Sequence, residues 1–148
     1  MFISKSVVGN YNYIGHFSVI DSTVLGNYCS IGAGAMIGGA EHPYQWWSTS
    51  FRLGKGAKKP QTVIEDDVWI GAKSTLRAGI RVGRGAVIGA HTLVLKDVPP
   101  YSIVVGSPAR TLRERFNQKQ IAKVEQTRYW EKNPREAMAI LRDIDSKD

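Results

Sequence analysis

Residues 41–49 gather the side chains of this sequence that could move a proton beside a bound molecule. Glu41 and His42 are adjacent in this stretch. Histidine is the usual side chain for removing a proton from an attacking hydroxyl, so His42 is the candidate general base. A carboxylate can orient such an imidazole, but adjacent residues of an extended chain point in opposite directions. Glu41 is therefore a candidate catalytic partner, and its contact with His42 is left open.

Aromatic and hydroxyl side chains follow the histidine. Tyr44, Trp46 and Trp47 suit stacking against a sugar ring or lining an acceptor cleft, and they equally suit fastening this segment to a neighbouring subunit. Ser48 and Thr49 could hydrogen-bond sugar hydroxyls or simply form a turn. We take Tyr44, Trp46, Trp47 and Ser48 as candidate substrate-binding residues.

The sequence after this stretch repeats every six residues. From residue 64 an aliphatic side chain returns at each sixth position, usually followed by glycine or an acidic residue. Six residues advance an α-helix by about 600°, so no helix face results. A short strand followed by a tight corner fits both the period and the fixed phase of the glycines. The aliphatic positions are Ile64, Ile70, Leu76, Val82, Ile88 and Val94.

The same period runs through the N-terminal part with one displacement. Two groups of aliphatic residues keep the six-residue spacing, and the second group is offset by one position near residues 22–24. A one-residue deletion at a corner accounts for the offset. The groups are Val8, Ile14 and Ile20, then Leu25, Ile31 and Ile37.

Hexapeptides of this kind predict a parallel β-helix, in which each coil of about 18 residues is a triangle of three short strands with the aliphatic side chains inside. Residues 8–42 and 64–99 would each give about two coils. The loop 41–61 leaves the coil between them. Such a short prism leaves edges and flanks to be covered, and trimer formation is the obvious cover.

The pattern changes near residue 100. Proline cannot donate to a strand ladder, so we expect the coils to end at Val98-Pro99-Pro100. Beyond Pro108, helix-forming residues with apolar spacing predict two helices, 111–130 and 134–145, separated at Asn133-Pro134. The expected division is thus a β-helix over residues 1–110 and a helical extension over 111–148.

Composition sets few limits on function. The chain has 148 residues and a net charge of +7, which favours anionic partners without choosing among nucleic acid, a phosphorylated cofactor and a nucleotide sugar. The basic residues lack aromatic interleaving, which argues against nucleic acid. Cys29 stands alone, so no intrachain disulfide is possible, and no apolar run approaches the length of a membrane span. We expect a cytoplasmic protein.

Two further runs, DDVWIGAKS at residues 66–74 and VIGAHTLVLKDVPPYSIVVGSPAR at 87–110, resemble the left-handed β-helix acyltransferases. The resemblance covers essentially residues 7–115. Within that family, EHPYQWWSTS is most similar to the small sugar O-acetyltransferases of the xenobiotic branch, related to the chloramphenicol and streptogramin acetyltransferases. The resemblance implies a left-handed helix, a homotrimer with active sites between subunits, and acetyl-CoA as co-substrate without a metal.

The resemblance also implies roles for residues. His42 would be the general base for direct attack of an acceptor hydroxyl on the thioester, without an acyl-enzyme. The acceptor would be a sugar or a polysaccharide precursor of capsule, lipopolysaccharide or exopolysaccharide. Small residues at the family's matching corners would admit the pantetheine arm, and cations would hold the phosphates of the coenzyme. These cofactor-binding candidates are Ala72, Ala90, Lys96, Arg110 and Arg113.

Other functions remain open on this fold. One is N-acetylation of a nucleotide-linked amino sugar, where the need for a base relaxes. Another is O-acetylation of an antibiotic. A third is a zinc-binding protein like the γ-class carbonic anhydrases, but His16, His42 and His91 lack the five-residue spacing of that family's zinc ligands.

Overall fold

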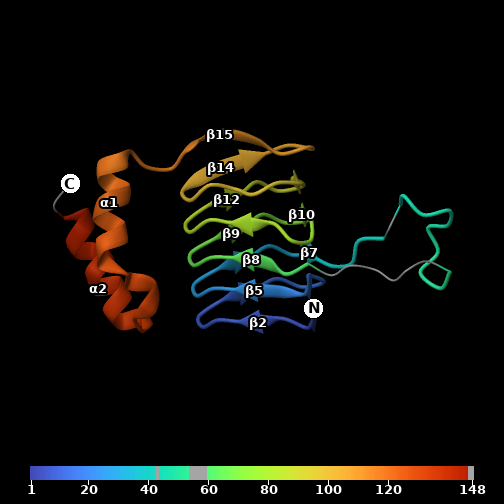
Figure 1. Cartoon of the computed structure of the whole chain (residues 1–148). Coiled ribbons are helices and arrows are strands. Elements are labelled where there is room, and N and C mark those ends of the chain that lie inside the picture. Colours follow the sequence, from blue (N-terminus) through green and yellow to red (C-terminus); the bar gives the residue numbers. More distant parts are fainter. Residues whose placement is uncertain (43, 54–59, 147–148) are drawn as a thin grey trace.

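The computed structural model describes residues 1–42, 44–53 and 60–146 of the chain. Short strands stack into a prism with three sheets, and two helices lie beside it (Figure 1). The first sheet, here sheet A, has five strands in the order β1, β4, β7, β10, β13. Their bounds are Phe2–Ser4, Val19–Asp21, Met36–Gly38, Thr75–Leu76 and Leu93–Val94.

The other two sheets complete the triangle. Sheet B has the order β11, β8, β5, β2, and sheet C the order β15, β14, β12, β9, β6, β3. The strands of sheet B are β2 (Val7–Val8), β5 (Thr23–Leu25), β8 (Thr62–Ile64) and β11 (Arg81–Val82). Those of sheet C are β3 (Tyr13–Ile14), β6 (Ser30–Ile31), β9 (Trp69–Ile70), β12 (Val87–Ile88), β14 (Ser102–Val105) and β15 (Arg110–Glu114).

From β1 to β13 successive strands visit sheets A, B and C in turn, and every strand pair is parallel except β14 with β15. The chain therefore winds as a β-helix, as the six-residue period predicts. The repeated aliphatic residues face inward and stack in register, for example Ile20 beside Ile37 and Ile64 beside Val82. These four side chains are at most 1% exposed. The interior is thus made by the residues that carry the period.

The expected one-residue deletion is confirmed. Ile20 and its partner Ile37 are 17 positions apart, whereas Ile64 and Val82 are 18 apart. The shorter coil turns from β4 to β5 through Ser22 alone, whose φ is 51°. One residue in the left-handed region makes the corner that two or more residues make elsewhere.

The expected end of the coils at Val98-Pro99-Pro100 is wrong. The first strand begins at Phe2, within the expected range 1–110, but the coils continue past Pro99-Pro100 into β14, which pairs with β12. The prolines occupy a corner, and the ladder donors lie outside them: Val98 N donates to Arg81 O, and Tyr101 N donates to Arg84 O. Proline's missing N–H therefore interrupts no rung.

The C-terminal helices are confirmed, but the first begins later than expected. Residues 110–114 form strand β15, antiparallel to β14, in place of the predicted first helical turns. Helix α1 (Gln118–Thr127) follows with an Asn117 capping box, then a 3-10 turn η1 (Tyr129–Glu131) and α2 (Pro134–Asp145). Asn133 caps α2 and Pro134 opens it, so the expected break falls where predicted. No helix in the described residues is long and apolar enough to span a bilayer.

The helices dock on the corners between sheets B and C. The Arg84 guanidinium lies 4.0 Å from the Trp130 ring centre, and its Nη1 donates to Glu125 at 2.8 Å. The Asn27 side chain donates to the Trp130 carbonyl, and the Tyr28 hydroxyl donates to the Lys132 carbonyl. The loop between β7 and β8 leaves the prism on the side away from these helices (Figure 1).

Candidate active site

The loop that follows β7 holds His42 in a defined orientation. His42 Nδ1 lies 2.9 Å from the carbonyl oxygen of Thr49, and its ring lies 6.2 Å from the Phe51 ring. A carbonyl can only accept, so Nδ1 carries the proton and Nε2 of the neutral ring has the free lone pair. The imidazole is exposed to solvent. The arrangement leaves one basic nitrogen available to an incoming molecule.

Glu41 has a different partner from the one considered for it. Its Oε1 accepts from Nε of Arg77 at 3.2 Å, whereas the His42 ring donates to the Thr49 carbonyl. Arg77 stands directly after β10, 36 positions along the chain from Glu41. Sequence reasoning missed both Arg77 and the Thr49 carbonyl, because no local spacing links them to the histidine.

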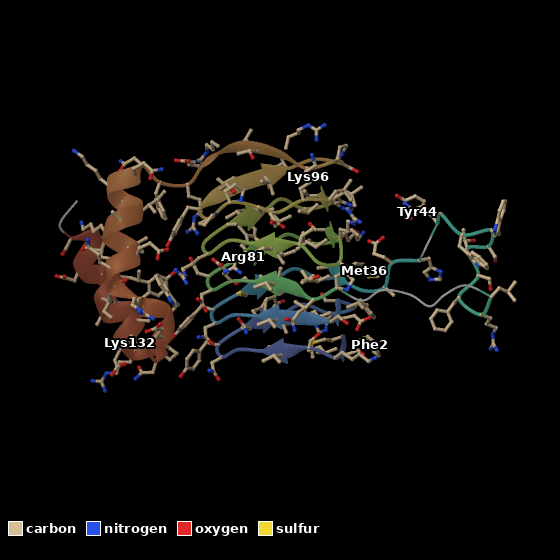
Figure 2. The ribbon with its side chains drawn as sticks, in the orientation of Figure 1. Phe2, Met36, Tyr44, Arg81, Lys96 and Lys132 are labelled. Atoms are coloured by element: carbon tan, nitrogen blue, oxygen red, sulfur yellow. The ribbon has the colours of Figure 1, made fainter. Side chains whose placement is uncertain are left out.

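The aromatic candidates lie on the outer part of the loop, with Tyr44 labelled in Figure 2. Trp47 is 96% exposed and Tyr44 79%, whereas Trp46 is 39% exposed. Ser48 is half-buried, and its Oγ accepts from the Ser50 N–H at 3.1 Å. These side chains could stack on a ligand or on another subunit. The lysines 55, 58 and 59 lie outside the described residues.

Ala72 and Ala90 stack at one corner of successive coils. The His91 N–H donates to the Ala72 carbonyl at 2.9 Å, while the N–H groups of both alanines donate to none of the described residues. The coils approach closely here, since a Cβ added to Gly71 would lie 2.4 Å from Ala90 N. Small side chains and free main-chain donors make this corner accessible to an extended polar chain.

Lys96 and Arg110 face a common pocket at the end of the prism, of about 520 Å³. Arg110 donates only to the carbonyl of Ala109, and none of the described residues pairs with Lys96. Asp97, which also lines the pocket, accepts from the Arg81 N–H. Two cations without a carboxylate partner form a site that favours a phosphate.

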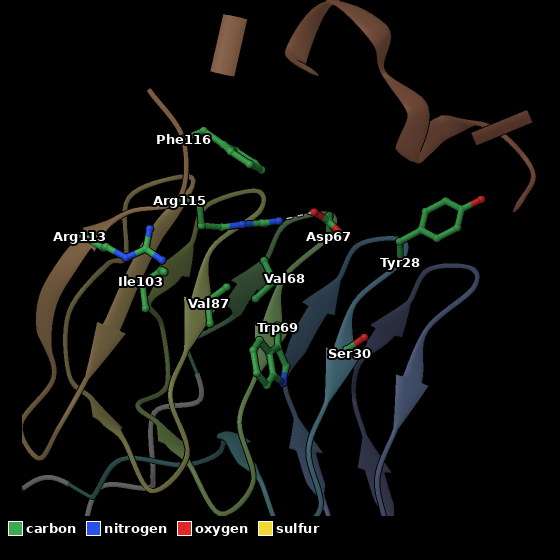
Figure 3. Close-up of a pocket in the computed structure, with 10 residues that line it drawn as sticks. All are labelled: Tyr28, Ser30, Asp67, Val68, Trp69, Val87, Ile103, Arg113, Arg115 and Phe116. Atoms are coloured by element: carbon green, nitrogen blue, oxygen red, sulfur yellow. Dashed lines mark hydrogen bonds and ion pairs between the residues drawn. The ribbon is translucent and has the colours of Figure 1, made fainter. Parts of the chain in front are cut away.

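Arg113 lies on a different surface from the other two cations. It lines a pocket of about 400 Å³ on the outer face of sheet C, with Trp69 and Ile103 (Figure 3). Arg115, beside it, donates to Asp67 Oδ2 at 3.4 Å. Strand β15 places Arg110 opposite Val105 and Arg113 opposite Ile103, with a register shift between Ile103 and Val104. Arg110 and Arg113 line separate pockets within this chain.

A single chain keeps the loop and the end pocket apart. Figure 2 shows Tyr44 on the loop beyond the prism and Lys96 on the prism itself. None of the described loop residues lines the end pocket, so the candidate base and the candidate phosphate site belong to separate parts of this chain. A loop that projects from one prism can reach the corner of another.

The other residues considered for chemistry are the cysteine and the remaining histidines. Cys29 is buried, its Sγ donates to the Glu65 carbonyl at 3.1 Å, and burial raises the pKa of its thiol to about 12. In the part of the chain that the structure describes, no three His, Cys, Asp or Glu side chains are close enough to hold a metal ion. His16 and His91 are exposed at coil corners, and His42 is on the loop.

Comparison with known proteins places these features in one family. The family model described as bacterial transferase hexapeptide, six repeats, matches residues 5–39 and 61–96. A chloramphenicol acetyltransferase from Escherichia coli is 38% identical over 141 residues, which cover 82% of this chain and 67% of that protein. One from Agrobacterium fabrum is 42% identical over 125 residues, covering 74% of this chain and 60% of that protein. The chain therefore spans 60% to 67% of these relatives' lengths.

A solved structure shows the same architecture. A hexapeptide-repeat acetyltransferase from Vibrio cholerae is 28% identical, with a TM-score of 0.70 over 78% of this chain and 68% of that one. A second structure of the Vibrio protein holds acetyl coenzyme A, with a TM-score of 0.58 over 78% and 71% of the two chains.

Proposed function

The chain belongs to the hexapeptide-repeat acetyltransferases, and on that premise we propose that it transfers acetyl from acetyl-CoA to a hydroxyl group with His42 as the base. The observation that carries the proposal is the hydrogen bond from Nδ1 to the Thr49 carbonyl. It selects the neutral tautomer whose Nε2 can accept a proton, which is the form that a general base requires.

The reaction is a direct transfer. The acceptor oxygen attacks the thioester carbonyl carbon while His42 Nε2 takes its proton. The tetrahedral intermediate then collapses, the C–S bond breaks, and the imidazolium returns the proton to the departing thiolate of coenzyme A. No acyl-enzyme is needed, and burial of Cys29 supports its exclusion as a nucleophile.

Acetyl-CoA is expected to lie along the corner of Ala72 and Ala90 and to reach the end pocket with its phosphates. Free main-chain donors at the corner suit the amides of the pantetheine arm. Lys96 and Arg110 supply two unpaired cations around one pocket, which supports their role with the phosphates. Arg113, on another surface, is a weaker member of this set, and its contact with coenzyme would require a neighbouring chain.

We infer that the site forms between subunits of a homotrimer. The absence of any described loop residue from the lining of the end pocket supports this arrangement. So does the apolar outer face of sheet C, where Tyr13 is 65% and Trp69 57% exposed. Burying such a face against another prism would contribute to association in proportion to the apolar area removed from water. His42 of one chain would then act on acetyl-CoA held by the next.

The acceptor is proposed to be a sugar or a polysaccharide precursor, as the exposed aromatic side chains of the loop suit a sugar ring. The relatives named chloramphenicol acetyltransferases, 38% and 42% identical, favour a second candidate, the hydroxyl of an antibiotic. Both candidates need the same base. N-acetylation of a nucleotide-linked amino sugar differs, because a neutral amine can attack without losing its proton first.

Thiol release from acetyl-CoA tests the proposal with a panel of free sugars, nucleotide sugars, amino sugars and chloramphenicol. Release driven by a hydroxyl acceptor, with product mass raised by one acetyl group, supports O-acetylation and identifies the acceptor class. Release only with amino sugars would move N-acetylation ahead. Absence of both turnover and coenzyme A binding would reject the acetyltransferase assignment.

A further inference from the structure

We propose that Arg77 is a positioning residue of the active site, which acts through Glu41 to hold the base-bearing loop against the prism. The predicted effect of Arg77 on catalysis rests on the proposed function. The predicted effect of Arg77 on the position of the loop does not. Glu41 takes a role different from direct contact with the imidazole. The ion pair between Glu41 Oε1 and Arg77 Nε, at 3.2 Å, is the observation that carries it.

Arg77 is the rigid side of this pair. It follows β10, and its N–H donates to the Val94 carbonyl of the next coil at 2.9 Å. Leu76, just before it, is paired with Ile37 of β7 and is 1% exposed. The main chain at Arg77 is thus fixed by neighbouring coils on both sides. The side chain of Arg77 therefore extends from a fixed point of the prism.

Glu41 is the loop side of the pair. The chain leaves the prism after Gly38 at the end of β7, and Gly38 and Gly39 both have positive φ, 75° and 111°. Two glycines in this region make an exit that the main chain alone specifies weakly. Glu41 comes two residues later and immediately precedes His42. Its bond to Arg77 therefore fixes the loop at the last position before the base.

The contacts of His42 itself do not tie it to the prism. Its ring nitrogen bonds to Thr49 and its ring lies near Phe51, both in the same loop. The hydrogen bonds described for Ser50, Arg52 and Leu53 also join loop residues to one another. These bonds set the tautomer and the internal shape of the loop. The Glu41–Arg77 pair instead sets where that shape sits relative to the coils.

The expected effect is moderate, because the two side chains are 44% and 53% exposed. Exposed pairs contribute little to global stability, since water screens them and both side chains lose rotamer freedom. Catalysis is more sensitive, since a small displacement of a base lowers the fraction of productive complexes. We expect kcat to fall about fivefold on loss of the pair, which corresponds to about 1 kcal/mol. The KM for acetyl-CoA should stay unchanged, because Arg77 does not line the end pocket.

A double-mutant cycle tests the proposal: Arg77→Ala, Glu41→Ala, both together, and the exchanged pair Arg77→Glu with Glu41→Arg. The two single variants should lower kcat equally, the double variant no further, and the exchanged pair should recover part of the loss. Arg81→Ala is the control, because the Arg81 side chain is 62% exposed and forms an ion pair with Glu65 away from the loop. A normal kcat in Arg77→Ala, or a loss that adds to that of Glu41→Ala, would overturn the proposal.

Hydrogen exchange of the loop separates this proposal from the proposed function. Amides of residues 41–53 should exchange faster in Arg77→Ala and Glu41→Ala than in the wild type or Arg81→Ala, with unchanged thermal unfolding midpoints. That result would support the anchor even in a chain that acetylates no acceptor in the panel. Equal loop exchange in all four proteins would overturn the anchor, whatever the activity of the wild type.

Discussion

His42 Nδ1 and the carbonyl oxygen of Thr49 are 2.9 Å apart, so the loop that presents the imidazole also determines which of its nitrogens is free. The bond uses a main-chain acceptor, which cannot change its protonation and needs no particular side chain at position 49. It differs from the carboxylate–histidine arrangement considered from the sequence. The carboxylate of Glu41 is directed to Arg77, and orientation of the ring is a property of the loop backbone.

The cations of the end pocket should control affinity for the coenzyme. We expect Lys96→Ala and Arg110→Ala each to raise the Kd for coenzyme A about tenfold, because each removes one charge-assisted contact to phosphate. Titration calorimetry at two salt concentrations measures this effect, and the variants should show a weaker salt dependence than the wild type. Lys119→Ala, on the exposed face of α1, is the control. Wild-type affinity in both pocket variants would remove them from the coenzyme site.

Sharing of the site between subunits predicts complementation. Lys96→Ala with Arg110→Ala in one chain, and His42→Ala in another, should each be nearly inactive alone. After unfolding and refolding as a mixture, the chains should regain part of the wild-type rate, because some interfaces combine an intact base with an intact coenzyme pocket. A mixture that gains nothing, although exchange of chains is verified by mass spectrometry, would indicate that each site belongs to one chain.

Close stacking at the corner predicts that Gly71→Ala destabilises the fold. The added Cβ would lie 2.4 Å from Ala90 N and 2.7 Å from the carbonyl carbon of Gly89, both main-chain atoms that cannot rotate away. We expect the free energy of unfolding to fall by about 1–3 kcal/mol, measured by chemical denaturation. Ala33→Ser, an exposed change at the same corner, should have little effect. A Gly71→Ala protein as stable as the wild type would contradict this description of the corner.

Burial of Cys29 predicts a thiol that is inert in the folded protein. With its pKa raised to about 12 by burial, only about one thiol in ten thousand is ionised at pH 8. Alkylation by iodoacetamide, followed by mass spectrometry, should be undetectable in the native protein and rapid in denaturant. Prompt modification of the native protein at unchanged activity would show that the coil around Cys29 opens readily.

Two buried phenols predict a loss of stability at high pH. Burial and then the hydrogen bond to Glu125 raise the pKa of Tyr101, and burial with the charge of Asp67 raises the pKa of Tyr129. Their neutral forms are favoured in the folded state, so their contribution is complete below the unfolded pKa of about 10 and is lost as pH rises above it. Denaturant titrations from pH 8 to 11.5 should show this decline, and Tyr101→Phe should reduce its slope.

The six-residue period was sufficient to predict the core, because one inward aliphatic residue per strand determines both the coil and its register. Even the deletion at Ser22 was visible as a change of phase. The end of the β-helix was not predictable in this way. Pro99 removes a hydrogen bond between coils only if the N–H at its position would donate to the neighbouring coil. Which positions donate depends on where the corner lies.

Strand β15 shows a second limit of local sequence. Its residues, RTLRE, are all exposed and have good helix propensity, and pairing with β14 overrides that propensity. The structure places His42 on the loop and small residues at the corners, as expected, and their roles in catalysis and binding stay predictions. The Glu41–Arg77 pair was not predicted, because it joins positions 36 residues apart that come together only when β7 and β10 pair.

The rate of acetyl transfer by His42→Ala, compared with its affinity for coenzyme A, tests the central claim most directly. We predict that kcat with the preferred hydroxyl acceptor falls about 10²- to 10⁴-fold, which is the usual contribution of a general base, while the Kd for coenzyme A stays within about twofold. His42→Gln, which keeps a polar side chain of similar reach, should be equally impaired. A His42→Ala protein that transfers acetyl at a rate close to that of the wild type would contradict the assignment of His42 as the general base.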